Sequence, residues 1–240
     1  MTLPVAGRRV AVLAPMRQEL GPLLRPLSLR EAETAGLLTG SAGATEIVAT
    51  ITGIGMQAAT LAAERVLDAG RVDHLVVVGI AGGIGASVAI GDLVLPEVVR
   101  DLATGVEHRP VALDPTPPRG TLVTSDRLVV DPTEVAGLAR SGVIAIDMET
   151  SAVAAVCEAR GCPWSVFRAI SDRAGDAAID LDVLGLAGKD GTPDLPALAR
   201  MLWKRPGRIR ELARLGRGMR LATRAAAAAA VRALERMPAS

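Results

Sequence analysis

The stretch HLVVVGI, residues 74–80, decides the fold class. After His74 it is apolar apart from Gly79, and it lacks the polar alternation of a strand that faces water on one side. A strand that is apolar throughout is typical of a sheet covered by helices on both faces. The glycine-rich loop AGGIGAS follows at residues 81–87. We therefore expect a buried central strand in an α/β fold.

Similar segments flank this stretch in both directions along the chain. Strand, glycine-rich turn and helix repeat to about residue 175, which predicts an α/β domain with a mostly parallel central sheet. Residues 101–119 hold several prolines and are expected to form a loop. The predicted strands are 9–14, 45–51, 74–80, 91–99, 121–124, 142–146 and 164–170, and the predicted helices follow Pro15 and cover 56–69, 133–140 and 149–160.

The chain changes character after residue 176. Helices are predicted at 196–204 and 207–236, separated by Pro206 and Gly207. Residues 200–240 contain ten arginines and one lysine but only two acidic residues, although the whole chain has a net charge of only +1. We expect an α/β domain over 1–176 and a basic helical extension over 177–240 that packs on it. The alternative for the segment 200–236 is a helix that contacts an anionic membrane surface.

Composition argues against several other classes of protein. The only cysteines, Cys157 and Cys162, form no CxxC pair, and both histidines are distant in sequence, so neither a metal nor another cofactor is expected. The N-terminus has no apolar signal region, and no segment is long and apolar enough to span a membrane. We expect a cytoplasmic protein, or one peripheral to the inner membrane through its basic tail. No motif supports binding of nucleic acid.

Three acidic residues follow three different predicted strands. These residues are Glu19, Glu149 and Asp172. In open α/β sheets the carboxyl ends of the strands form the ligand crevice, so the three side chains are expected in one site. The alternative for each is an acidic residue stabilised by a helix N-terminus. In VIAIDMETSA (143–152), Asp147 and Glu149 are costly to bury unless they face water, a cation or a substrate.

Five blocks of sequence, in order, resemble the nucleoside phosphorylase and nucleosidase superfamily. The resemblance covers residues 9–176 and is greatest to the branch of methylthioadenosine/S-adenosylhomocysteine nucleosidases. It implies a nucleoside phosphorylase-like fold, a homodimer or larger oligomer, and hydrolysis of the N-glycosidic bond of a 5′-substituted adenine nucleoside. The blocks are APMRQEL (14–20), TGIGMQAA (52–59), GIAGGIGASVAIGDLVLPE (79–97), IAIDMETSAVAAVC (144–157) and VFRAISDRAGD (166–176).

The resemblance also implies roles for individual residues. Glu19 would activate the attacking water, and Asp172 would help to protonate N7 of the departing purine. Glu149 would hold the two ribose hydroxyls, with Met148 packed on the sugar. The other expected substrate contacts are Ala81, Gly82, Val129, Ile54 and Met16, while Arg17, Arg168, Asp147 and Ser171 are expected near phosphate or behind the contacting residues.

Two alternatives to hydrolysis remain open at this stage. Ile80 stands where family members usually carry a phosphate-binding Ser or Thr, which favours water, whereas Arg17 adds positive charge near the nucleophile, which favours phosphate. A phosphorylase of a lipid-linked adenosine, such as adenosylhopane, would suit the basic tail, which resembles the tails of adenosylhopane phosphorylases. A binding protein on a degenerate nucleosidase fold is the other alternative, and the presence of Glu19, Glu149 and Asp172 argues against it.

Overall fold

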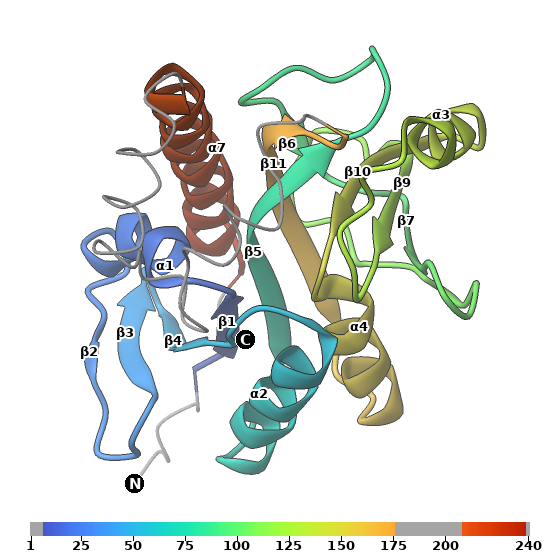
Figure 1. The fold of residues 1–240 in the computed structure, drawn as a ribbon. Coiled ribbons are helices and arrows are strands. Elements are labelled where there is room, and N and C mark those ends of the chain that lie inside the picture. Colours follow the sequence, from blue (N-terminus) through green and yellow to red (C-terminus); the bar gives the residue numbers. More distant parts are fainter. Residues whose placement is uncertain (1–6, 176–207, 239–240) are drawn as a thin grey trace, which may run out of the picture.

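The computed structural model describes residues 7–175 and 208–238 (Figure 1). The helices are α1 (Arg17–Leu24), α2 (Met56–Asp68), α3 (Pro132–Arg140), α4 (Thr150–Ala159) and α7 (Arg208–Glu235). The strands are β1 (Arg9–Ala14), β2 (Arg30–Glu31), β3 (Leu38–Ala42), β4 (Thr45–Ile51), β5 (His74–Gly83), β6 (Leu93–Val94), β7 (Val98–Asp101), β8 (Glu107–His108), β9 (Thr121–Thr124), β10 (Val143–Asp147) and β11 (Trp164–Arg173).

Within these described ranges, all the strands belong to one mixed sheet. Its order is β2-β3-β4-β1-β5-β10-β9-β7-β8, and β11 pairs with both β5 and β6. The central strands β4, β1, β5 and β11 run parallel to their neighbours in this group. The predicted α/β class, with a largely parallel centre and flanking helices, is confirmed.

Both faces of the sheet are buried, as the apolar central strand predicts. In β1, Ala11 and Leu13 join the core cluster that also contains residues of α2 and α4, whereas Val10 and Val12 join the cluster that contains residues of α1 and α7. The residues of β5 divide between the two clusters in the same way. Helices on both faces therefore explain why these strands show no polar alternation.

The direction of β10 determines where the site forms. This strand runs antiparallel to β5, with Ile146 opposite Gly82. The carboxyl end of β10 therefore meets the second half of β5 from the opposite direction, beside Ile80 and Ala81. The site therefore forms where the ends of strands that run in opposite directions converge.

Several boundaries differ from the prediction. The single strand expected at 91–99 is wrong, because β6 and β7 are separate strands divided by a segment that contains Pro96, which cannot donate to a ladder. The hairpin of β2 and β3 was not predicted, and the expected loop at 101–119 contains the two-residue β8. In the helix predicted after Pro15, which is α1, Leu20 and Leu23 are buried, whereas Leu24 is 40% exposed.

Helix α7 confirms the helix predicted at 207–236. It packs along β11 and β5 and against α1 (Figure 1). None of the helices in the described ranges is long and apolar enough to cross a membrane. The helix predicted at 196–204 lies outside the described residues, and the division of the chain at residue 176 stays a prediction. The packed face is built of small residues, Ala222, Ala226, Ala229, Ala230 and Ala233, and the exposed face carries Arg210, Arg214, Arg217, Arg220 and Arg224.

Candidate active site

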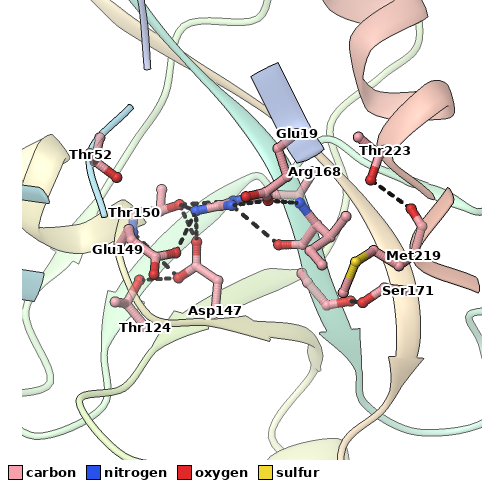
Figure 2. A network of polar contacts seen from close by, with 12 residues as sticks. Glu19, Thr52, Thr124, Asp147, Glu149, Thr150, Arg168, Ser171, Met219 and Thr223 are labelled. Carbon is pink, nitrogen blue, oxygen red and sulfur yellow. Dashed lines mark hydrogen bonds and ion pairs between the residues drawn. The ribbon is translucent and has the colours of Figure 1, made fainter. Parts of the chain in front are cut away.

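Arg168, in the middle of β11, is the centre of a buried polar network (Figure 2). Its Nη2 lies 2.6 Å from Asp147 Oδ2 and 3.1 Å from Glu149 Oε2, and its Nη1 lies 3.8 Å from Glu19 Oε1. Residues from α1, β10, β11 and the turn before α4 thus share one site. Three carboxyl groups around one guanidinium exceed its charge, so burial favours protonation of at least one of them.

Glu19 is almost completely buried in the first turn of α1. Burial raises the pKa of its carboxyl to about 8, although Arg168 and the Ile80 N–H act in the opposite direction. Oε1 accepts a hydrogen bond from the Ile80 N–H at 2.8 Å. Oε2 is buried and has no hydrogen-bond partner among the described residues. An unpaired oxygen and a pKa near neutrality are the properties of a general base.

Glu149 occupies the N-cap position of α4, directly after β10 and Met148. Its Oε1 accepts from the Gly55 N–H at 3.0 Å, and its Oε2 accepts from Arg168. Burial raises the pKa of this carboxyl, with Asp147 adding to the rise and Arg168 opposing it. Each carboxylate oxygen can accept a further hydrogen bond. Glu149 can therefore accept from two adjacent hydroxyl groups without losing its present partners.

Asp147, by contrast, is fully engaged with protein groups. Its Oδ1 accepts from the Thr124 hydroxyl at 2.7 Å, and its Oδ2 accepts from both Arg168 and the Thr150 hydroxyl. Asp147 and Glu149, the two neighbouring carboxylates of VIAIDMETSA, thus differ in their hydrogen-bond partners. Asp147 faces a cation inside the protein, as expected for a residue behind the substrate contacts, while Glu149 retains acceptor capacity.

The two candidate arginines differ in their surroundings. Arg168 is fully buried, its Nε lies 3.3 Å from Thr150 Oγ1, its Nη1 donates to the Ile80 carbonyl at 3.2 Å, and its Nη2 contacts the carboxylates. Every nitrogen of its guanidinium therefore has a protein partner. Arg17 is exposed on α1, whereas Glu19, two residues later, is buried.

Asp172 lies further along β11, beyond an irregularity in the pairing with β5. The register shifts between Ile170 and Asp172, so Ser171 is an extra residue in the strand, a β-bulge. The Ser171 hydroxyl donates to Asp172 Oδ1 and lies 3.4 Å from the Ala81 carbonyl oxygen. Asp172 Oδ2 lies 3.5 Å from the point where a side chain on Gly82 would begin. The structure thus brings Ala81, Gly82, Ser171 and Asp172 together.

The remaining candidates are less closely connected to the charged network. Met16 precedes α1 and accepts from the Glu19 N–H, and Ile54 precedes the Gly55 that binds Glu149. Met16, Ile54 and Met148 are partly exposed. The Val129 side chain is buried in a separate small core cluster, so only its backbone remains a candidate contact.

The sequence did not reveal four residues on which this network depends. Thr124 and Thr150 bind Asp147, and Ser151 N–H donates to the Thr124 hydroxyl at 2.9 Å. A side chain on Gly79 would begin 2.4 Å from both Arg168 Nη1 and Glu19 Oε1, so only glycine fits there. The break that Gly79 makes in an otherwise apolar run was the one available signal. In the described part of the chain, no group of three His, Cys, Asp or Glu residues could hold a metal ion.

Comparisons with known proteins identify the family of the chain. A family model described as the phosphorylase superfamily matches residues 9–118 and 100–189. Curated 5′-methylthioadenosine/S-adenosylhomocysteine nucleosidases from Shewanella sp. (strain MR-7) and Shewanella baltica (strain OS155) are 27% and 26% identical over an aligned length of 208 residues, and the alignments cover 72% of this chain and 88% of theirs.

Solved structures resemble the fold over nearly the whole chain. The S-adenosylhomocysteine nucleosidase from Streptococcus pyogenes, in complex with 5-methylthiotubericidin, has a TM-score of 0.75 at 19% identity, and the match covers 98% of this chain and 100% of that one. The futalosine hydrolase of Helicobacter pylori has a TM-score of 0.72 at 17% identity, covering 96% and 98%. This extent includes α7, which the resemblance in sequence did not reach.

Proposed function

The chain belongs to the phosphorylase superfamily, and from this premise we propose that it hydrolyses the N-glycosidic bond of a 5′-substituted adenine nucleoside. The observation that carries the proposal is the buried Oε2 of Glu19, which has no hydrogen-bond partner in the described part of the chain and lies beside Arg168 and Glu149. The relatives named as methylthioadenosine/S-adenosylhomocysteine nucleosidases support the same class of substrate. The enzyme releases free adenine and a free sugar.

The proposed mechanism divides the work among three carboxyl groups. Glu149 accepts hydrogen bonds from the two ribose hydroxyls and so fixes the sugar. As the bond from C1′ to N9 breaks, positive charge develops on the sugar, by analogy with glycoside hydrolysis, and Asp172 gives a proton to N7 of the purine. Water adds to C1′, and its proton passes to Glu19, whose anion Arg168 stabilises.

Water is favoured over phosphate as the nucleophile by the surroundings of Glu19. The nitrogens of Arg168 are occupied by protein groups, Ile80 offers no hydroxyl, and Arg17 is exposed. Phosphorolysis, including that of a lipid-linked adenosine, remains the runner-up. Its support is the positive charge of Arg17 two residues before Glu19.

An assay for adenine separates these activities. Methylthioadenosine, S-adenosylhomocysteine and adenosine are incubated with the protein, with and without inorganic phosphate, and the sugar product is identified by mass spectrometry. We expect adenine and a free sugar without phosphate. A sugar 1-phosphate formed only with phosphate would instead establish the phosphorylase. Binding of a nucleoside without turnover would support the non-catalytic alternative.

Two variants test the assigned residues in the same assay. We expect Asp172→Asn to lose at least about 99% of the activity, since general acid catalysis contributes about 10²–10⁴-fold. We expect Glu149→Ala to lose activity because it removes the acceptor of both ribose hydroxyls. Both variants are expected to keep the circular dichroism spectrum of the wild type. Full activity in both variants would contradict the assignment of these residues.

We also propose a cytoplasmic homodimer whose α7 contacts an anionic membrane surface. The exposed arginines of α7 and the 54% exposed Leu221 support the membrane contact. Light scattering after gel filtration measures the mass of the assembly. Sedimentation with vesicles of phosphatidylglycerol, against phosphatidylcholine vesicles, measures the contact. A monomer would contradict the first proposal, and equal sedimentation with both lipids would contradict the second.

A further inference from the structure

Helix α7 approaches the backbone of β11 closely at the bulge beside Asp172. A side chain on Gly218 of α7 would begin 2.2 Å from the Ser171 carbonyl oxygen and 3.3 Å from its carbonyl carbon. Ile90 Cγ2 lies 3.3 Å from the same point. Both atoms of Ser171 belong to the backbone, so they cannot move aside as a flexible side chain can. The helix reaches this position only because residue 218 has no side chain.

The contact between Gly218 and Ser171 depends on the absence of a side chain at position 218, because the polar side chain of Thr223 in α7 bonds within its own helix. Figure 2 shows Met219 of α7 on the side of Ser171, with Thr223 one turn further along the helix. The Thr223 hydroxyl donates to the Met219 carbonyl at 2.6 Å, within the helix. The small buried residues Ala222 and Ala226 continue the face of Gly218 along α7. This face sets the distance between the helix and the strand.

A second glycine in the same helix provides the contrast. Gly216 lies one half-turn before Gly218, and a side chain there would meet nothing within 4 Å. Glycine inside a helix is less favourable than alanine in both places. At position 216 nothing in the described surroundings requires glycine, whereas at position 218 the Ser171 carbonyl does.

We propose that Gly218 is a positioning residue that sets the orientation of Asp172 through the bulge at Ser171. Ser171 shares a peptide bond with Asp172, and its hydroxyl donates to the Asp172 carboxylate. A displaced Ser171 carbonyl rotates that peptide and moves the carboxylate away from the place beside Ala81 and Gly82. The inference rests on the proposed function, in which Asp172 protonates the departing base.

Two alanine variants of the full chain test the proposal. Gly218→Ala and Gly216→Ala bring the same gain in helix propensity, so they differ only in the collision with Ser171. We expect Gly218→Ala to lower kcat for methylthioadenosine at least tenfold with KM changed less than threefold. We expect Gly216→Ala to stay within twofold of the wild type and to raise Tm. Equal kcat values for the two variants would overturn the proposal.

A double-mutant cycle distinguishes positioning from a general loss of structure. If Gly218 acts through Asp172, adding Gly218→Ala to Asp172→Asn lowers the residual rate by less than twofold, because the group it positions is already absent. A further loss as large as the one in the wild-type background would mean that Gly218 acts elsewhere and would overturn the proposal.

Two further outcomes are decisive. If Gly218→Ala does not fold, Ile90→Ala replaces it, because this variant loosens the packing of α7 at the bulge without a collision. A threefold or larger fall in kcat that disappears in the Asp172→Asn background supports the proposal. An unchanged kcat overturns it. If the wild type releases no adenine from any nucleoside, the proposed function fails and this inference fails with it. An active wild type with an unaffected Gly218→Ala variant refutes the inference alone.

Discussion

At the scale of single residues, Glu19 is the group whose charge depends most on pH near neutrality. Its pKa of about 8 means that the free protein holds it mostly as the acid at pH 7. A base must be ionised, so we expect kcat/KM to rise with pH and to level off above about pH 8. Glu19→Gln is expected to lose this rise and to lower kcat by about 10²–10⁴-fold. Profiles from pH 5.5 to 9.5 measure both, and an unchanged profile in the variant would argue against Glu19 as the base.

Arg168 is the only cation that Asp147, Glu149 and Glu19 contact within the described network. Arg168→Leu leaves three buried acids without it, and breaking a buried pair costs about 3–5 kcal/mol. We expect this loss in the free energy of unfolding at pH 8 and a smaller loss at pH 5, because burial raises the pKa of Glu19 and of Glu149 and so favours their protonated forms at the lower pH.

Urea unfolding at the two pH values measures the effect of Arg168→Leu. Arg160→Leu is the matched control, because Arg160 makes a salt bridge at the surface with Asp68, and such pairs contribute about 0–1 kcal/mol. A loss for Arg168→Leu that is the same at pH 5 and pH 8 would contradict the charge argument.

At the scale of elements, β5 admits the network only through Gly79. Gly79→Ala places a methyl group 2.4 Å from Arg168 and Glu19, and overpacking of this kind costs about 1–3 kcal/mol. We expect that loss of stability together with a fall in kcat of at least tenfold. The control is Gly137→Ala inside α3, where the new side chain would begin 4.0 Å from the flexible end of Arg140. Thermal melts and the adenine assay measure both variants, and equal behaviour of the two would refute this role of Gly79.

The sequence correctly predicted the bounds of strands that are set by the strand's own apolar residues. The bounds of β1, β4 and β9 agree with the predicted strands because each is a short run with buried apolar positions. The two-residue strands β2 and β8 have exposed or polar side chains, and only their pairing partners define them. The antiparallel direction of β10 depends on the path of the whole chain, which local patterns do not contain.

The same limit applied to the candidate site. The acids Glu19 and Glu149 were found because carboxylates after apolar strands are unusual, and the structure joins them through Arg168. Gly79 and Gly218 were not found as site residues. Each is required by a group far away in sequence, Arg168 for the first and Ser171 for the second, and glycine has many other uses in turns and caps.

At the scale of the whole molecule, two buried groups give the stability opposite dependences on pH. Burial lowers the pKa of His74 to about 4, and Arg8 adds to the effect. Its Nε2 lies 2.8 Å from Ser165 Oγ. As the pH falls from 6.5 to 4, the unfolded chain binds a proton that the folded His74 does not, so stability is lost on the acid side.

Glu19 acts in the other direction. Its pKa is raised from 4.5 to about 8, so between these values the unfolded chain has released a proton that the folded chain keeps, and stability falls as the pH rises. These two groups together place the maximum of stability between pH 4.5 and 6.5, where their slopes oppose each other.

Each of the two dependences of stability on pH can be removed by replacing one residue with an uncharged one. His74→Gln keeps a side-chain donor for Ser165 and is expected to flatten the acid side, which amounts to at most roughly 3 kcal/mol for a pKa change of this size. Glu19→Gln is expected to flatten the alkaline side, so that its Tm relative to the wild type rises from pH 5 to pH 9. Melting curves at half-unit steps of pH measure both variants. If either substitution shifts the curve equally at every pH, the ionisation of that residue is not linked to folding, because a constant shift reports only lost contacts.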